Sequence, residues 1–367
     1  MLFRSERFIW SEHQTAWLER IERAHDNIRV ALNWCLSGRD EETGVLLAAA
    51  MHRFWFARGY IREGRRWGQI AASKQQVSAR GRALALRNLA FFLMHQGEAE
   101  QAVKLAEQAA ALARSVGEPA LMAWILHGLA LAADAVGDFE RSERLYGEML
   151  EMARQAGDEA LAARALCYIG NRLRTRGDNV RARMVLEEAF SLARPRHDKW
   201  LTSVVTGALG VALAPEDPGQ ALRLLEESLG LAHDIAHRWL IAHRPEDLAA
   251  VLASSDRAEL SATLLGASEA LRDAFGFAHI SSGQAAVNAA GAPARERLGP
   301  AAFEAAWTKG RAMTADEAVA LALGRSAPER VERAHPPGGL TGREVQIVLD
   351  ITRGLTNRQR ELSPRWR

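Results

Sequence analysis

Three histidines come closest, by type and spacing, to a metal site. His233 and His237 are four positions apart, which places two imidazoles on one face of a helix, and His243 follows. A structural zinc site uses four ligands as a rule. His237 also stands where the other repeats described below carry the aspartate or glutamate of a turn, so the pair is expected to straddle a helix end. We therefore expect no metal site.

The motifs of the common hydrolases and nucleotide-binding enzymes are absent from the sequence. It contains no Gly-x-Ser-x-Gly nucleophile elbow and no glutamate-flanked His-x-x-x-His. It also contains no Gly-x-x-x-x-Gly-Lys-Ser/Thr loop, whose backbone amides would cradle a nucleotide phosphate. We expect a chain that is not an enzyme, does not hydrolyse ATP and carries no cofactor.

The composition is that of a mostly helical globular chain, with 48% hydrophobic and 25% charged residues and little tyrosine or proline. The first 30 residues are charged throughout, so neither a signal peptide nor a spanning helix is expected, and we place the chain in the cytoplasm. Cys35 and Cys167 are far apart, which argues against a disulfide framework. The net charge of +2 is too small to demand an acidic partner.

Glycine turns recur at a spacing of 40 residues, at Gly97, Gly137 and Gly177. A period of this length indicates stacked structural repeats that share one core. A first helix ends at each of these glycines and a second helix runs to a further turn, at Gly117 or Gly157. Small residues recur at one position of the second helix and would allow close helix packing: Ala102, Ser142 and Ala182.

The repeated hairpin resembles tetratricopeptide-like repeats of about 40 residues. Further second helices are expected around Ala221 to Leu229 and Ala258 to Ala270, and three divergent helices precede the clear repeats, two of them ending at Gly38 and Gly59. The fold class is therefore all-α: a tetratricopeptide-like α-solenoid of helical hairpins with a small C-terminal helical segment, a partial helix-turn-helix. Its divergent N-terminal hairpins cover residues 1–76 and its repeats cover residues 77–275.

The segment after the repeats is expected to cover the last hydrophobic face of the stack. We assign residues 276–324 to this helical cap. Its first part, Gly276 to Pro293, is rich in alanine, glycine and serine and is predicted to be a linker, whereas Thr314 is predicted to cap a helix. Residues 325–339, with several prolines and glycines, are predicted to be a second, flexible linker.

In tetratricopeptide superhelices the first helix of each pair lines the inner groove, which implies a set of binding candidates here. They combine aromatic, cationic and amide side chains that suit a peptide or a small effector. An ordinary solvated face is the alternative, and Trp124 could equally be a packing residue. The candidates are Arg87, Phe91, His95, Trp124, His127, Asp134, Arg164, Asn171 and Arg174, with Thr206 as a less certain addition.

The last segment, residues 340–367, carries two capping boxes, Thr341 with Glu344 and Thr356 with Gln359, with Gly354 between them. It resembles the opening half of a LuxR-type helix-turn-helix, in which a recognition helix then enters the major groove. The resemblance implies that Thr356, Asn357 and Arg358 contact DNA. The family's second helix continues through isoleucine-alanine, but here arginines and Pro364 follow. We expect an incomplete module with at most non-specific DNA affinity.

Further stretches resemble large ATP-dependent transcriptional regulators of the LuxR family, in which a tetratricopeptide sensor region precedes the LuxR module. These stretches are Trp17 to Arg20, Ala24 to Leu32 and Phe303 to Ala318. The resemblance implies the sensor portion of such a regulator, which binds a protein partner or a small effector in the groove and no membrane. The alternative is a free-standing tetratricopeptide scaffold for protein partners, among them a separately encoded ATPase half.

Overall fold

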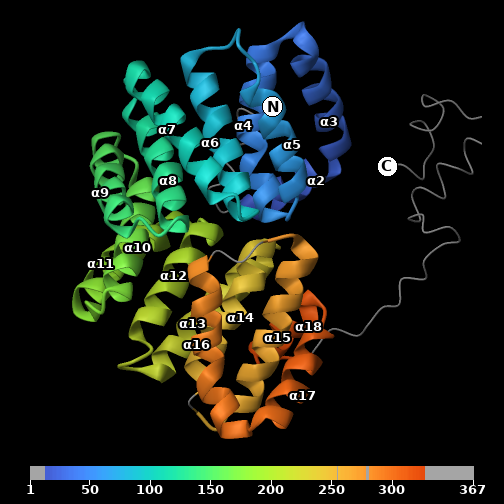
Figure 1. Cartoon of the computed structure of the whole chain (residues 1–367), viewed down its shortest axis with the longest axis vertical. Coiled ribbons are helices and arrows are strands. Elements are labelled where there is room, and N and C mark those ends of the chain that lie inside the picture. Colours follow the sequence, from blue (N-terminus) through green and yellow to red (C-terminus); the bar gives the residue numbers. More distant parts are fainter. Residues whose placement is uncertain (1–12, 254, 278–280, 327–367) are drawn as a thin grey trace, which may run out of the picture. The chain divides into compact units, whose positions relative to one another are not determined.

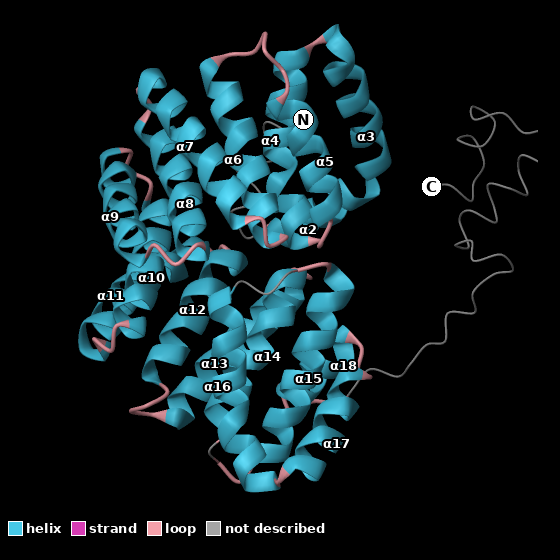
Figure 2. Ribbon diagram, in the orientation of Figure 1, coloured by secondary structure: helices cyan, strands magenta, loops and turns pink. Residues whose placement is uncertain are grey.

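A computed structural model describes residues 13–253, 255–277 and 281–326, and these residues form helices with no β-strand among them (Figures 1 and 2). The expected all-α, tetratricopeptide-like fold is confirmed. The helices are α2 Gln14–Arg23, α3 His25–Trp34, α4 Glu41–Ala57, α5 Ile61–Ala72, α6 Ala79–His95, α7 Ala99–Val116, α8 Pro119–Ala135, α9 Phe139–Gln155, α10 Glu159–Thr175, α11 Asn179–Ala193, α12 Lys199–Leu213, α13 Pro218–Asp234, α14 Arg238–Leu252, α15 Ala258–Phe275, α16 Ser281–Leu298, α17 Pro300–Arg311 and α18 Ala315–Ala322.

The repeated turns have the backbone conformation that the glycine pattern predicts. Gly97, Gly137 and Gly177 follow α6, α8 and α10 and have φ angles of 87°, 81° and 83°, in the left-handed region that side chains disfavour. Two later turns reach the same region without glycine, at His197 with φ 54° and Ala236 with φ 46°. Because these two turns contain no glycine, the glycine pattern in the sequence weakens after the third clear repeat, although the helical pairs continue.

The N-terminal part contains one helix more than the sequence predicts. Four helices, α2 to α5, lie within the described part of residues 1–76, whereas three were expected. The boundary that the pattern misses is at Ala24, where α2 ends and α3 begins with no glycine or proline. Gly38, an expected helix end, lies in a π-helical turn, Cys35–Arg39, with φ 96°.

The predicted linker from Gly276 to Pro293 is wrong for most of its length. Helix α16 begins at Ser281 and includes Pro293. Alanine has the highest helix propensity of any residue, so an alanine-rich stretch forms a helix where neighbouring helices can pack against it. The N-cap at Thr314 is confirmed: its hydroxyl accepts the Glu317 backbone N–H, and the Glu317 carboxylate accepts that of Thr314. The C-terminal segment 340–367, and all but Arg325 and Ser326 of the second linker, lie outside the described residues.

Small residues at the helix crossings allow the pairs to pack closely. Ala102, Ser142 and Ala182 are fully buried, as the repeated small position predicts. The closest approach is between α15 and α17, where a Cβ added to Gly310 would collide with the Thr263 carbonyl oxygen and one added to Gly266 with that of Trp307. The backbones of these two helices touch, so only glycine fits at the crossing.

The helical stack curls until its first helices meet helices from the middle of the chain (Figure 1). The Arg58 guanidinium, just after α4, donates hydrogen bonds to the carbonyl oxygens of Ile235 at 2.8 Å and Ala236 at 3.1 Å. Gln14 of α2 accepts the backbone N–H of Trp200 at 3.1 Å. The inner surface is therefore closed by contacts between segments almost 200 residues apart in sequence, rather than left as an open groove.

Replacement of Gly310 by alanine tests the contact between α15 and α17. The added methyl group must push two backbones apart, so Gly310→Ala is expected to reduce the free energy of unfolding by about 2 kcal/mol or more. A matched change, Gly230→Ala in α13, meets no atom within 4 Å and is expected to stabilise by about 0.5–1 kcal/mol. Urea unfolding followed by circular dichroism measures both. Equal effects of the two substitutions would contradict the close crossing.

Candidate functional site

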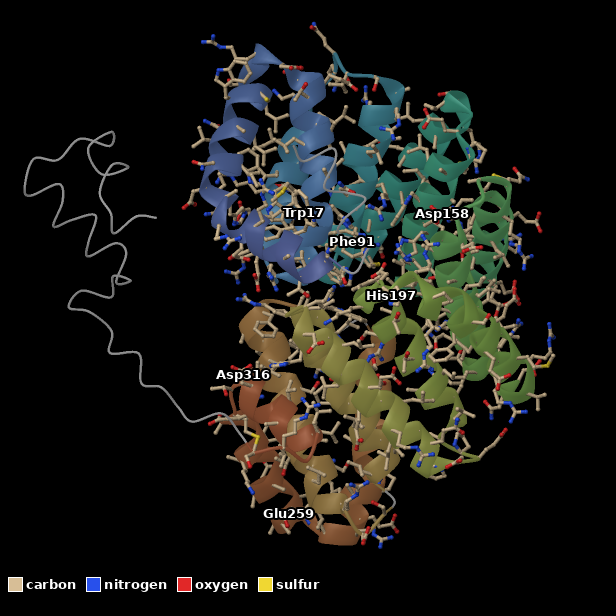
Figure 3. The ribbon with its side chains drawn as sticks, turned by 180° about the vertical axis from the view of Figure 1, so that it is seen from behind. Trp17, Phe91, Asp158, His197, Glu259 and Asp316 are labelled. Atoms are coloured by element: carbon tan, nitrogen blue, oxygen red, sulfur yellow. The ribbon has the colours of Figure 1, made fainter. Side chains whose placement is uncertain are left out.

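A cavity of about 400 Å³ lies inside the curl of the stack. Its walls come mainly from α4, α6, α8, α10, α12 and α14, the first helices of successive pairs. Phe91, labelled in Figure 3, belongs to this inner lining and lies where the N-terminal helices meet the C-terminal ones. The volume is within the range of small-molecule pockets.

Eight of the nine groove candidates from the sequence line this one cavity. They are Arg87, Phe91, His95, His127, Asp134, Arg164, Asn171 and Arg174. The ninth, Trp124, lies directly behind them, against the guanidinium groups of the cavity wall. The less certain candidate, Thr206, is fully buried and does not line the cavity. Thr356, Asn357 and Arg358 lie outside the described residues, so the sequence-based assignment of DNA contacts to them stays a prediction.

Three arginines and two tryptophans form a cluster at one end of the cavity, which we call the arginine–tryptophan cluster: Arg53, Arg87, Arg164, Trp124 and Trp200. The Arg164 guanidinium carbon lies 4.6 Å from the ring centre of Trp124 and 4.4 Å from that of Trp200. Arg53 lies 4.4 Å from Trp200, and Arg87 lies 5.0 Å from Trp124. The electron-rich ring faces stabilise cations that would otherwise repel one another.

The electrostatic balance of the cavity wall is strongly positive, because six arginines and two aspartates line it. Burial lowers the pKa of the Arg53 guanidinium, and the charge of Arg164 lowers it further. Burial also lowers the pKa of Arg164 to about 10. Asp198 attracts both arginines from its place as the N-cap of α12, but burial raises the pKa of this carboxyl. The arginines remain protonated at neutral pH, so the positive charge persists.

Aromatic side chains form a second part of the lining, which we call the aromatic wall: Phe56, Phe91, His95 and Trp239. Phe56 packs edge-on against Phe91 with ring centres 4.8 Å apart, and His95 lies 4.4 Å from Phe91. Trp239 of α14 lies 5.9 Å from Phe56 of α4. The aromatic wall therefore joins the first helices to α14 as well as lining the cavity.

A third part of the lining is polar and carries most of its charge in pairs, while apolar side chains such as Leu131, Val204 and Val211 complete the wall. The Tyr146 hydroxyl donates to Asp134 at 2.9 Å, and Arg172 lies 3.4 Å from the same carboxylate. Arg244 pairs with Asp247 at 2.5 Å. A side chain at Gly207 of α12 would collide with the Arg244 guanidinium, so the glycine provides the space in which Arg244 lies.

Two buried histidines of the cavity wall have unused hydrogen-bonding atoms. His127 is 4% exposed, and neither its Nδ1 nor its Nε2 has a hydrogen-bond partner among the described residues. His52 is 5% exposed, and its Nε2 likewise has none there. Buried polar atoms in native proteins are nearly always satisfied by protein, water or a ligand. These nitrogens therefore mark positions that a polar ligand group could fill.

The three histidines of the metal hypothesis have three different surroundings. His233 lies 3.1 Å from Asp316, His237 accepts the Leu240 backbone N–H as the N-cap of α14, and His243 stacks on Trp239. The expected position of His237 at a helix end is confirmed. Within the part of the chain that the structure describes, no three or more metal-ligating side chains form a group.

Several lining residues were missed by the sequence analysis: Arg53, His52, Phe56, Tyr168, Trp200, Trp239 and Arg244. The 40-residue register could have found one of them. Arg244 follows Arg164 by twice 40 residues, with the lining residue Val204 midway. Arg53 could have been found from its own turn, since it precedes Gly59 by six residues as Phe91 precedes Gly97. Neither the 40-residue spacing nor the distance to a glycine turn predicts Trp200 and Trp239.

The comparisons with known proteins support the repeat assignment. Residues 81–155 match the family model described as tetratricopeptide repeat. A crystal structure of a Rap protein complexed with Competence and Sporulation Factor aligns over 84% of this chain and 97% of its own, with 13% identity and a TM-score of 0.51. At this identity the likeness shows the fold alone. The chain contains tetratricopeptide repeats in an all-α solenoid.

Relatives in sequence are similar over a limited region. A protein of Mycobacterium bovis and one of Mycobacterium tuberculosis, each bearing the provisional name HTH-type transcriptional regulator, are 31% identical over 121 residues. The match covers 30% of this chain and 14% of each relative. In the described residues, no helix combines the length and the apolar character that crossing a bilayer requires.

The buried histidines make the stability of the fold sensitive to acid. Burial lowers the pKa of His95, His237 and His243 to about 3, against about 6.5 in an unfolded chain. Between these values the unfolded state binds protons that the folded state excludes, so stability is full above pH 6.5 and is lost as the pH falls. Each such histidine is expected to cost about 1.4 kcal/mol between pH 7.5 and 5.5.

Urea unfolding at pH 7.5, 6.5 and 5.5 measures this loss in a window where most carboxylates stay ionised. His95→Phe keeps the aromatic packing. It is expected to reduce the loss in free energy of unfolding between pH 7.5 and 5.5 by the contribution of one histidine. The control is His197→Asn in the exposed turn before α12, labelled in Figure 3, which is expected to leave the loss unchanged. A free energy of unfolding that stays constant from pH 7.5 to 5.5 would contradict the burial of neutral histidines.

Proposed function

We propose that this chain is the sensor region of a LuxR-type transcriptional regulator and that it binds a small effector in the cavity of its solenoid. The observation that carries the proposal is the convergence of charged and aromatic side chains from six first helices on one cavity of about 400 Å³. Repeat folds use their inner surface for recognition. A closed inner surface of this size suits a small molecule.

Two observations support the assignment to transcription. The matched region of the mycobacterial relatives belongs to proteins provisionally named as HTH-type transcriptional regulators. The sequence from Leu340 to Arg358 resembles the opening half of a LuxR-type helix-turn-helix.

The second candidate is a tetratricopeptide scaffold that binds protein partners without a small effector. Tetratricopeptide repeats build protein-interaction scaffolds, and residues 81–155 match their model. Exposed apolar residues on the outside of the stack favour this candidate: Val180 and Met184 of α11 are 59% and 61% exposed. The two candidates differ in whether function requires a cavity that a small molecule can enter.

A cavity-filling substitution distinguishes them. Val211 of α12 lines the cavity, so Val211→Phe adds bulk inside it without changing a charge. In a thermal-shift screen of fractionated small metabolites from the native host, we expect a fraction that raises the melting temperature of the wild-type chain. Ligand at 100 times its Kd stabilises the folded state by about 2.7 kcal/mol. Val211→Phe is expected to abolish the shift.

Val180→Phe on the outer surface is the matched control and is expected to retain the shift. In the native host, Val211→Phe is expected to change the same transcripts as deletion of the gene, whereas Val180→Phe is expected to leave them unchanged. If Val211→Phe retained full transcriptional activity and Val180→Phe lost it, the scaffold would be the correct function and the effector sensor would be wrong.

A further inference from the structure

The arginine–tryptophan cluster and the aromatic wall are adjacent along the same helices. Arg87 and Phe91 are four residues apart on α6, and Arg53 and Phe56 are three apart on α4. Residues at these separations lie on one helical face, about one turn apart, or roughly 4.5–6 Å along the axis. The cavity thus presents cations from two helices and, one turn further along both, a surface of aromatic rings.

The cluster is built to attract an anion of more than one charge. Arg53 and Arg164 both lie over the ring of Trp200, each 4.4 Å from its centre, and the charge of Arg164 acts on Arg53. Arg87 and Arg164 likewise share Trp124. Guanidinium groups bind carboxylate and phosphate oxygens with paired hydrogen bonds. Asp198 acts on Arg53 and Arg164 from behind the wall, and one further negative charge would still offset only part of the charge of the three arginines.

His127 provides an independent sign of a ligand at the same place. It comes from α8, is buried, and lines the cavity with two ring nitrogens that have no hydrogen bond among the described residues. Burial lowers the pKa of the His127 imidazole well below its usual value, and the charges of Arg164, Arg87 and Arg53 lower it further. A neutral imidazole donates one N–H, which an anion held by those three arginines can accept.

We infer that the effector is a small organic anion with at least two negative charges and an aromatic or apolar body. Its anionic group is held by Arg53, Arg87 and Arg164 with an N–H from His127, and its body packs on Phe56, Phe91 and Trp239. A phosphomonoester and a dicarboxylate both present this chemistry. The inference rests on the proposed effector site and specifies the class of molecule that occupies it.

Titration calorimetry with four probes tests this class at constant ionic strength. The probes are phenyl phosphate, phenylsuccinate, inorganic phosphate and phenol, which separate the phosphomonoester, the dicarboxylate, the anionic group alone and the ring alone. We expect one of the two aromatic dianions to bind with one-to-one stoichiometry and at least about tenfold more tightly than inorganic phosphate or phenol. The tighter of the two identifies the source of the dianion.

Variants assign the binding to the two ends of the cavity. Arg87→Gln is expected to weaken the aromatic dianion at least about tenfold, since it removes a charge-assisted pair of hydrogen bonds. Phe91→Leu is expected to reduce the preference for phenyl phosphate over inorganic phosphate and to leave the affinity for inorganic phosphate unchanged. The matched control is Arg176→Gln, because Arg176 directly follows α10, is 61% exposed and pairs with Glu143 outside the cavity. It is expected to bind as the wild-type chain does.

If circular dichroism shows that Arg87→Gln does not fold, Arg53→Gln replaces it as the variant that removes a charge from the arginine–tryptophan cluster. It is expected to weaken the aromatic dianion in the same way. The inference is overturned if neither aromatic dianion binds more tightly than phenol, or if Arg176→Gln weakens binding as much as the cavity variants do. A neutral metabolite that binds the wild-type chain and not Val211→Phe would overturn the anionic class and leave the proposed effector site standing. Failure of every metabolite fraction and every probe would overturn both.

Discussion

The constant length of the helical pairs is the constraint on which the rest of the structure depends. Because successive pairs are 40 residues long from α6 to α12, equivalent faces of these first helices point to the same inner surface. Arg87, His127 and Cys167 line the cavity at intervals of 40 residues, as do Phe91, Leu131 and Asn171. The left-handed turns keep this interval by ending each helix at an equivalent position. Insertion of one residue within a first helix would rotate the residues that follow it in that helix by about 100°.

The curl of the stack adds what the repeat alone cannot supply. Hydrogen bonds from Arg58 to the backbone around Ile235, and aromatic contacts from Phe56 to Trp239, bring α4 opposite α14. This contact converts an extended groove into a cavity of about 400 Å³. It also places Arg53 beside Trp200, a residue of α12, and so completes the arginine–tryptophan cluster. A cavity with the volume of a small-molecule pocket therefore arises from contacts between distant segments of the solenoid.

Much of the fold follows from local signals that the sequence carries. Glycines with positive φ, buried small residues and apolar stripes predict the helical pairs from α6 to α11. The same register predicts the inner face of α6, α8 and α10, and with it eight residues of the cavity wall. The missed elements lack such signals. The boundary at Ala24 has no glycine or proline, and the alanine-rich stretch of α16 reads as a linker because its helix depends on its neighbours.

The lining residues Trp200 of α12 and Trp239 of α14 could not be predicted in the same way, because their contacts with α4 depend on how far the stack curls. The curl is a sum of small rotations between pairs, set by packing rather than by any single residue. Whether Arg53 meets Trp200 is therefore a property of the whole chain. This dependence also makes the cavity the part of the structure that responds most to a change in the relative positions of the ends.

The distance between α2 and α13 tests the closed cavity most directly. Thr15 of α2 lies 3.5 Å from the Asp234 carbonyl oxygen at the end of α13, and both native cysteines are buried. Spin labels on Thr15→Cys and Asp234→Cys in the full chain are expected to broaden each other's continuous-wave electron paramagnetic resonance spectrum strongly, because the two residues are in contact. A doubly labelled spectrum without dipolar broadening, equal to the sum of the two singly labelled spectra, would show that the stack is open and would contradict the account.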